Sequence, residues 1–304
     1  MLDYKLLEAF AMVILEGGFE KAARKLHLTQ SAISQRIRQL EDLYGSVLLK
    51  RTTPPEPTAS GLPLFIHYKK VRQLEADLDR QNTAEEPAYT TLAIGVNADT
   101  LETWFLTAVE EILRRENVVL DLQVDDQDKT HELLKDGKVW GCITNRPRPQ
   151  QGCSAEYLGT VRYGIFATAA FKKRWFASGM NIEAFQNAPM VRFNRKDELS
   201  SQILTAMFGS LPEALADHSG LSQPPVFFVP STDIYGSFVT SGLCWGVLPE
   251  QQSHPLESDG KIINLSPADS VDVQLYWHSW TLKSETMQGF SQHFIKRAKA
   301  ILRN

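Results

Sequence analysis

The sequence predicts an α/β protein with an N-terminal winged helix-turn-helix, one long helix, and a C-terminal α/β domain of two lobes. Two short helical patterns joined by a tight turn lie near the start of the 304-residue chain. Leucine and valine then recur at intervals of seven residues. From residue 91 on, short apolar runs alternate with helical patterns, which is typical of an α/β domain with a mostly parallel sheet. We expect the three parts to span residues 1–60, 61–88 and 89–304.

The composition is that of an ordinary soluble globular protein, with 43% apolar and 22% charged residues. No apolar run approaches the roughly 18 residues that a membrane helix needs. Asp3 and Glu8 lie where a signal peptide carries Lys or Arg, which argues against export. Cys142, Cys153 and Cys244 are odd in number and widely spaced, so they form neither a disulfide framework nor a C-x-x-C metal pair. We expect a cytoplasmic protein without a membrane segment, metal or other cofactor.

Helical periodicity begins near the N-terminus. Apolar residues at three- and four-residue spacing predict a helix over residues 3–16, which Gly17-Gly18 ends. A second short helix is predicted over residues 19–27, with small alanines that let another helix approach closely. Thr29 is suited to cap a third helix over residues 30–42. The second helix of a helix-turn-helix enters the major groove of DNA.

The third predicted helix has one apolar face, with Ile33, Ile37 and Leu40, and one polar face. The amides, hydroxyls and guanidinium groups of the polar face can hydrogen-bond bases and phosphates. Although the chain has a net charge of −4, the segment from Lys21 to Leu40 holds five basic and no acidic residues. We predict that this face reads double-stranded DNA; the alternative is a solvated helix face. The candidate DNA-binding residues are Thr29, Gln30, Ser31, Ser34, Gln35, Arg36 and Arg38.

A predicted wing follows this helix. Apolar residues 47–49 predict a short strand, and the prolines between Pro54 and Pro57 stiffen the return of the chain. Side chains on the intervening turn are placed to contact phosphates, which position a protein on DNA without reading its sequence. Arg51 alternatively pairs within the chain, with Glu41 or Asp42. The candidate phosphate-binding residues are Lys50, Arg51 and Thr52.

Residues 60–82 are predicted to form one long helix with an apolar seam. A lone seam of this kind buries nothing in a monomer, so we predict that the helix pairs with its equivalent in a second copy. Packing against the second domain of the same chain is the alternative. Residues 82–89 are the predicted linker. The seam residues are Leu64, Val71, Leu74 and Leu78.

The C-terminal domain is predicted to have two similar α/β lobes. Lobe I spans about residues 89–160 and 268–304, and lobe II spans about residues 161–267. Residues 154–168 are predicted to be strand that crosses between the lobes. Because ligands bind at the carboxyl ends of the strands in such sheets, we expect a small molecule to bind in the crevice between the lobes.

Polar side chains follow several predicted strands. Free N–H groups at the start of the first predicted helix of the C-terminal domain can hold a carboxylate, while Asn97 or Asp99 receives an α-ammonium. Asp99 and Glu102 also match a D-x-x-E capping box, so Asp99 alternatively caps its own helix. Asp125 is either a partner for a ligand cation or a turn residue that faces water. The candidate effector-binding residues are Asn97, Asp99, Thr100, Asp125, Arg192, Asn194, Ser231 and Thr232.

An enzymatic function has little support. Residues 217–219, Asp-His-Ser, are the types of a hydrolytic triad, but neighbours in sequence rarely point at one centre, and no G-x-S-x-G motif is present. His278 alternates with aromatic residues on a predicted strand, which favours a packed histidine over a catalytic base. No H-E-x-x-H motif, P-loop or paired-cysteine spacing occurs. We expect neither catalytic residues nor metal ligands; a two-lobed binding protein or enzyme with an N-terminal interaction module is the remaining alternative.

Residues 19–52 resemble the DNA-binding signature of LysR-type transcriptional regulators. The resemblance extends over the whole chain and implies a periplasmic-binding-protein-like effector domain in a bacterial cytoplasmic regulator. It also implies a homodimer and, beyond it, a homotetramer. The matching residues are Ala22, Ala23, Leu26, Thr29, Gln30, Ser31, Ser34, Ile37, Leu40, Glu41, Gly45, Leu48, Arg51 and Thr52.

Four further segments, RTTPPEPTASG, VNADTLETW, LQVDD and LYWH, resemble the branch of that family that regulates arginine and lysine export. This implies a response to lysine or arginine and action at an exporter gene, with RNA polymerase as a further candidate partner. The chain departs from that branch after its VRF segment, where Asn194 and Arg195 stand in place of an expected acidic residue. A regulator for another ligand, such as an organic acid held by Arg192 and Arg195, is therefore the second hypothesis.

Overall fold

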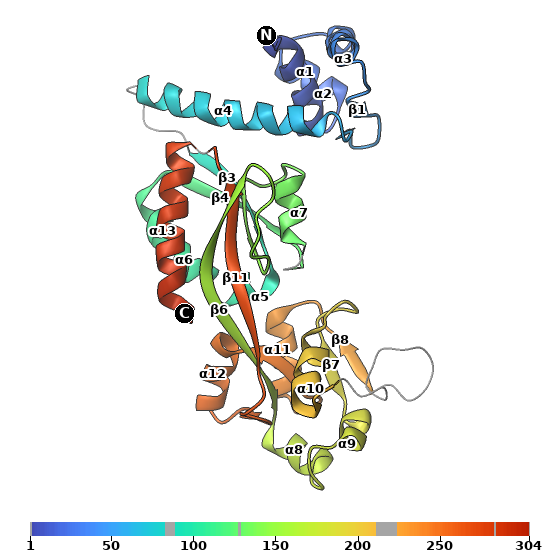
Figure 1. Cartoon of the computed structure of the whole chain (residues 1–304), viewed down its shortest axis with the longest axis vertical. Helices are drawn as coiled ribbons and strands as arrows, with labels where there is room; N and C mark the ends of the chain where they lie inside the picture. The colour runs from blue at the N-terminus through green and yellow to red at the C-terminus, as the bar shows by residue number, and fades with distance from the viewer. Residues whose placement is uncertain (1, 83–88, 127–128, 211–223, 283, 304) are drawn as a thin grey trace.

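The protein is described from a computed structural model, in which residues 2–82, 89–126, 129–210, 224–282 and 284–303 are placed. Its parts follow one another along the long axis of the molecule (Figure 1). The helix-turn-helix part lies at one end, the long helix α4 crosses next to it, and the two lobes follow. The predicted α/β fold with three parts is confirmed.

Three helices build the N-terminal part, as predicted. Helix α1 spans Tyr4–Leu15, α2 spans Phe19–Lys25 and α3 spans Gln30–Tyr44. The Thr29 side chain caps α3 by accepting a hydrogen bond from the Ala32 N–H, so the predicted N-cap is confirmed. The apolar faces of the helices meet in one buried core.

The wing is shorter than predicted. Strand β1, Leu49–Lys50, pairs antiparallel with β2, Glu56–Pro57. The expected strand over residues 47–49 is wrong, because the Glu41 carboxylate accepts the N–H groups of Leu48 and Leu49 that a longer ladder would use. Val47 is exposed, and Lys50 lies in the strand rather than on the turn.

Helix α4 spans Leu62–Asn82 and serves both parts of the chain. Phe65 and Tyr68 are buried in the core of the N-terminal part, and Leu64 packs partly buried against the same core. The expectation that the seam buries nothing in a monomer is therefore wrong at its first residue. Farther along, Val71 and Leu74 are half-buried and Leu78 is exposed. The role of these residues in pairing two copies stays a prediction.

Helix α4 also contacts lobe I. Lys69 Nζ donates a 2.5 Å hydrogen bond to the backbone carbonyl of Gly137. Lys70 Nζ lies 5.2 Å from the ring centroid of Trp280. At Lys69 and Lys70, these contacts bear out the alternative that α4 packs on the second domain of its own chain. Most of the predicted linker, residues 83–88, lies outside the described residues.

A seven-stranded mixed sheet runs through lobe I into lobe II in the order β10-β6-β11-β5-β3-β4, with β9 paired to β6. Only β3 with β4 and β3 with β5 are parallel pairs in this sheet. The expected mostly parallel sheet is wrong, because β6 and β11 connect the lobes in opposite directions and pair antiparallel. The strands are β3 Thr90–Val96, β4 Val118–Val124, β5 Gly141–Thr144, β6 Cys153–Ala167, β9 Gly246–Pro249, β10 Ile263–Asn264 and β11 Val271–Trp280, with a separate parallel pair β7 Met190–Arg192 and β8 Val226–Phe228.

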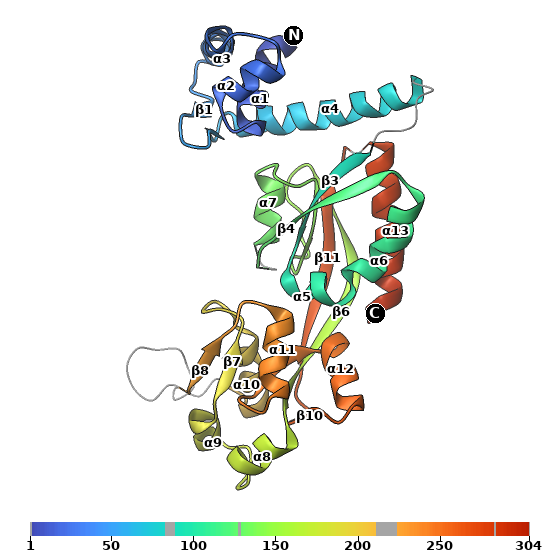
Figure 2. The same cartoon turned by 180° about the vertical axis from the view of Figure 1, so that it is seen from behind.

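Helices cover this sheet in both lobes (Figure 2). In lobe I, α13 and α6 lie side by side, and Phe294 of α13 packs on Trp277 of β11 with ring centroids 5.0 Å apart. In lobe II, Trp245 packs on Phe185 at 5.2 Å. The helices are α5 Ala98–Thr100, the π-helical turn η1 Leu101–Phe105, α6 Leu106–Arg115, α7 Thr130–Lys135, α8 Ala169–Trp175, α9 Ile182–Asn187, α10 Leu199–Phe208, α11 Thr232–Thr240, α12 Glu250–Ser258 and α13 Glu285–Ile301.

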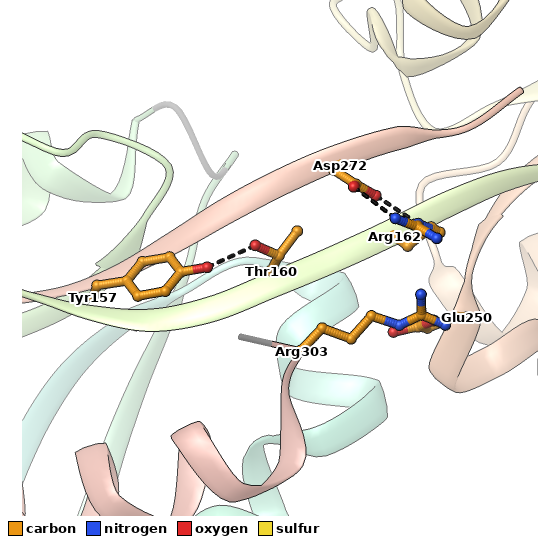
Figure 3. A network of polar contacts seen from close by, with 6 residues as sticks. All are labelled: Tyr157, Thr160, Arg162, Glu250, Asp272 and Arg303. Carbon is orange, nitrogen blue, oxygen red and sulfur yellow. Dashed lines mark hydrogen bonds and ion pairs between the residues drawn. The ribbon is translucent and has the colours of Figure 1, made fainter.

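Strands β6 and β11 form the connection between the lobes, and the predicted crossing strand over residues 154–168 corresponds to β6. Arg162 of β6 makes two hydrogen bonds, of 2.7 and 2.9 Å, to the Asp272 carboxylate of β11 (Figure 3). The C-terminal segment joins them there: the Arg303 carbonyl accepts the Thr160 N–H at 2.7 Å, and the Arg303 guanidinium pairs with Glu250 of α12. Among the described helices, none is long and apolar enough to cross a membrane.

Candidate functional sites

The polar face of α3 is open to solvent, opposite its apolar stripe. Ile33, Ile37 and Leu40 are fully buried, as the periodicity predicts. Ser34 and Arg36 are half-buried at the border between the two faces. The exposed candidates are Thr29, Gln30, Ser31, Gln35 and Arg38. All seven candidates thus lie at least partly exposed on one side of α3, and their role in DNA binding stays a prediction.

The wing residues are exposed and carry weak contacts of their own. Lys50 Nζ lies 3.6 Å from the Glu56 carboxylate, and the Arg51 guanidinium lies 5.9 Å from the ring centroid of Phe19. The hydroxyl of Thr52 donates to the Pro54 carbonyl at 2.7 Å. The alternative pairing of Arg51 with Glu41 or Asp42 does not form among the described residues, where Arg51 contacts the Phe19 ring instead. Exposed ion pairs contribute about 0–1 kcal/mol, so phosphates can replace these partners at little cost.

A crevice of about 730 Å³ lies between the lobes. The ends of β3 and β4 line it from lobe I, and the segments after β7 and β9 line it from lobe II. Among the described residues that line this space, one is a lysine, Lys196, and five carry carboxyl groups. The acidic lining residues are Asp99, Asp125, Asp126, Asp197 and Glu198. This surplus of negative charge favours a cationic ligand.

Asp99 joins the two lobes. Its carboxylate accepts a 2.8 Å hydrogen bond from the Thr232 hydroxyl of lobe II and a 2.9 Å bond from the Tyr163 hydroxyl of β6. Burial raises the pKa of Asp99, although these two hydrogen bonds oppose the shift. The alternative that Asp99 caps its own helix is wrong, because Asn97 occupies the N-cap position of α5 and Asp99 lies inside the helix.

Two neighbouring aspartates end β4 and differ in their contacts. Asp125 lines the crevice, and its carboxylate accepts the N–H of Asp126 at 2.8 Å, a local turn contact of the kind expected in the alternative reading. Asp126 accepts a 3.1 Å hydrogen bond from the Asn194 side chain of lobe II. The structure thus brings Asp125 and Asn194 to the crevice, as predicted, and adds Asp126.

Three of the predicted effector residues lie outside the crevice lining. Thr100 is buried behind it, and Ser231 caps α11 by accepting the Ile234 N–H. Arg192 is buried and donates to the backbone carbonyl of Asp197. Arg195 stacks on the ring of Phe228, 4.6 Å from its centroid, and does not line the crevice either. An organic acid held by Arg192 and Arg195 therefore has no support in this arrangement.

Several crevice residues were not predicted from the sequence: Lys196, Asp197, Glu198, Tyr235 and Gln252. Tyr163, which donates to Asp99 from outside the lining, was not predicted either. Asp197 and Glu198 carried a usable signal, since they follow the β7 strand closely. Tyr163 and Gln252 carried none, because only the folded chain shows that Tyr163 reaches Asp99 and that the start of α12 lines this space.

No catalytic or metal centre is formed by the residues that the structure describes. His278 is buried, its Nε2 donates to the Arg146 carbonyl at 2.8 Å, and burial lowers its pKa, so it is a packed histidine. Groups of three or more metal-ligating side chains are absent from the same described ranges. The Asp-His-Ser stretch at residues 217–219 lies outside them.

Two family models match the chain, one for each part. Residues 4–62 match the bacterial regulatory helix-turn-helix protein of the lysR family, and residues 86–299 match the LysR substrate binding domain. The first match covers α1 to α3 with the wing, and the second covers both lobes. The DNA-binding face and the crevice thus fall within separate matched regions.

Relatives and solved structures resemble the chain over its whole length. It is 36% identical over 302 residues to the HTH-type transcriptional regulator ArgP of Aeromonas salmonicida, covering 99% of this chain and 98% of the relative. ArgP of Mycobacterium tuberculosis matches with a TM-score of 0.88 and 32% identity over 100% of both chains. Full-length LysG of Corynebacterium glutamicum with bound effector Arg matches with a TM-score of 0.83 and 30% identity, again over 100% of both.

Proposed function

This chain belongs to the LysR family of bacterial transcriptional regulators, and from that premise we propose that it senses a basic amino acid in its crevice. As a member of the family it is a DNA-binding regulator with an effector-binding domain, and not an enzyme. The proposed effector is lysine or arginine, and the proposed targets are genes of amino-acid export or metabolism.

The observation that carries the proposed ligand is the charge of the crevice. Five carboxyl groups line it against one lysine among the described residues, and Arg192 and Arg195 do not contribute to the lining. A desolvated ammonium or guanidinium group needs a carboxylate partner, whereas an organic acid meets repulsion here. LysG, which shares 30% identity with this chain, was solved with Arg as its bound effector.

The proposed DNA interface is the exposed face of α3 together with the wing. Arg38 and Gln35 can form bidentate contacts with bases in the major groove, and Lys50 and Arg51 contact phosphates beside it. Pairing of two copies through α4 then sets the spacing of the half-sites. A tetramer and a contact with RNA polymerase are further proposals that follow from the family resemblance.

The proposed mechanism couples these two sites through lobe movement. The hydrogen bonds from Thr232 to Asp99 and from Asn194 to Asp126 join the lobes across the crevice. A ligand that binds between those residues changes how the lobes are held. It alters DNA binding only if it binds one lobe arrangement more tightly than the other. Helix α4, which contacts lobe I at Lys69, connects the lobes to the DNA-binding part.

The test is a titration of the purified protein with lysine, arginine and a set of organic acids, followed by calorimetry and tryptophan fluorescence. We expect saturable binding of lysine or arginine and none of the acids. Genomic DNA fragments are then captured at physiological salt with and without the bound amino acid. If the set of captured promoters changes with lysine or arginine, the proposal is supported. If the same promoters are captured with and without both amino acids, the protein is a regulator with another ligand.

A further inference from the structure

Gln252 is a crevice residue whose side-chain amide has a defined orientation. It lies in α12 and lines the crevice from lobe II. Its Nε2 donates a 2.9 Å hydrogen bond to the backbone carbonyl of Thr232. Since a carbonyl oxygen can only accept, the nitrogen faces Thr232 and Oε1 points elsewhere. A Cβ at Gly236 would stand 2.6 Å from Nε2, so this glycine leaves room for the amide.

Two buried oxygens on opposite walls of the crevice lack donors. Oε1 of Gln252, in lobe II, has no hydrogen-bond partner in the described part of the chain. Among the described residues, Oδ1 of Asn97 in lobe I also has no hydrogen-bond partner, and Asn97 is only 7% exposed. Buried acceptors are almost always paired in folded proteins. Two exceptions that line one crevice indicate a place where a ligand supplies the donors.

The group that fits these acceptors is an ammonium. Thr232 links Gln252 to the buried carboxylate of Asp99, because its hydroxyl donates to Asp99 and its carbonyl accepts from Gln252. Asn97 precedes Asp99 by two residues and lines the same crevice. The surroundings therefore offer two free oxygens and one negative charge. An ammonium provides three N–H donors and a positive charge, whereas a carboxylate adds acceptors where none can be satisfied.

We propose that Asn97 and Gln252 receive the α-ammonium of the effector from opposite lobes, with Asp99 supplying the compensating charge. This rests on the proposed basic-amino-acid function and adds Gln252 as a specificity-determining residue. Both oxygens are shielded from solvent in this arrangement of the lobes. The ligand therefore enters when the lobes part, and closure over its ammonium satisfies acceptors from both lobes together.

Arginine provides a selective probe, because its α-amino group is its only ammonium and acetylation there removes that charge. Calorimetry on the full-length protein compares arginine with Nα-acetyl-arginine for the wild type and Gln252→Met. We expect Gln252→Met to weaken arginine binding by about 10- to 100-fold, the effect of losing a hydrogen bond to a charged group. Binding of Nα-acetyl-arginine, already weak, stays nearly unchanged. The neighbouring Gln251→Met, outside the crevice lining, serves as the matched control.

A second variant, Asn97→Leu, removes the acceptor of the other lobe and should show the same selectivity. If both variants weaken the two ligands by equal factors, these side chains support the fold rather than the ammonium, and the inference is overturned while the proposed function stands. If the wild type binds neither arginine nor lysine, the proposed function fails and this inference fails with it. Circular dichroism of each variant separates lost binding from lost folding.

Discussion

Asn194 of lobe II donates a 3.1 Å hydrogen bond from Nδ2 to Oδ1 of Asp126 in lobe I, and both residues line the crevice. The bond joins the lobes at a second point, separate from the bond between Thr232 and Asp99. A neutral amide suits position 194, because a carboxylate there would face Asp126 with like charge. The residue that departs from the arginine/lysine-export pattern thus has a role in how the lobes are held.

Asn194→Asp should therefore separate the lobes in the ligand-free protein. Repulsion between the new carboxylate and Asp126 replaces their hydrogen bond, so we expect a larger radius of gyration in small-angle X-ray scattering at pH 7. Arginine should reduce the difference, since a cation between the two carboxylates removes the repulsion. Asn187→Asp, on the exposed surface of α9, is the control. Scattering curves that coincide for wild type and Asn194→Asp would contradict the assigned role.

Asp99→Asn should stabilise the protein at neutral pH. Burial raises the pKa of Asp99, so the folded state binds its proton more tightly than the unfolded chain does. Stability therefore falls as the pH rises from the ordinary aspartate pKa of about 3.9 through the raised value, and stays lower above it. We expect the variant to unfold at higher urea concentration than wild type at pH 7, with a difference that fades below about pH 4. The exposed Asp42→Asn should show no such trend.

The same variant should bind arginine poorly, because it keeps the size of the side chain but lacks its charge and has one acceptor oxygen in place of the two that Thr232 and Tyr163 use. If Asp99→Asn is less stable than wild type at pH 7, the hydrogen bonds to the Asp99 carboxylate stabilise the fold by more than its burial destabilises it, and this prediction is wrong.

Arg38→Ala should weaken specific DNA binding and leave effector binding intact. Arg38 is exposed on the polar face of α3, a helix at the other end of the molecule from α11 and α12 (Figure 1). Loss of one base contact costs about 1–3 kcal/mol. Ser34→Ala should also weaken specific DNA binding, by a smaller factor. Fluorescence anisotropy with an operator fragment and calorimetry with arginine measure the two activities. Arg114→Ala, exposed on α6, is the control; equal losses of both activities in Arg38→Ala would mean that the residue supports the fold.

Lys69→Met should change how stability depends on alkaline pH. Burial lowers the pKa of Lys69 to about 8, although Asp121 opposes the shift. The folded state thus binds this proton less tightly than the unfolded chain, so Lys69 favours folding more as the pH rises from about 8 toward its ordinary 10.5. Over that range we expect the free energy of unfolding of the wild type to rise relative to that of Lys69→Met, by at most about 1.4 kcal/mol per pH unit.

Urea unfolding at several pH values from 7 to 10 measures this difference. The exposed Lys21→Met, in the DNA-binding part, is the matched control and should follow the wild type. If the curves for wild type and Lys69→Met run parallel, Lys69 is solvated in solution and its contact with Gly137 does not hold α4 on lobe I.

The buried and exposed faces of α3 could be predicted from local sequence, because their determinants lie within one helix. Thr29 caps α3 through a bond to a residue three positions on, and Ile33, Ile37 and Leu40 follow the helical period onto the buried side. The wing was less predictable. Its short ladder depends on Glu41 turning back onto Leu48, a contact between elements that no periodicity describes.

The crevice could be predicted only in part, because tertiary structure decides which strand ends meet. Asn97 and Asp125 were found from the rule that ligands lie at strand ends. Asp99 satisfied the pattern of a capping box, yet the fold brings Thr232 within 2.8 Å of it, and that bond determines its role. The direction of β6 and β11 likewise reflects the path of the chain between lobes, which the apolar runs do not encode.

The attachment of Arg303 to Thr160 and Glu250 bears on how the protein is handled at the bench. An affinity tag or fluorescent reporter attached at residue 304 lies next to Arg303, whose backbone contacts β6 and whose side chain contacts α12. Its length and charge then act on the contacts by which Arg303 joins β6 to α12. Reporters for effector response are better attached at the N-terminus, with DNA affinity checked, or inserted in an exposed turn such as that at Gly179.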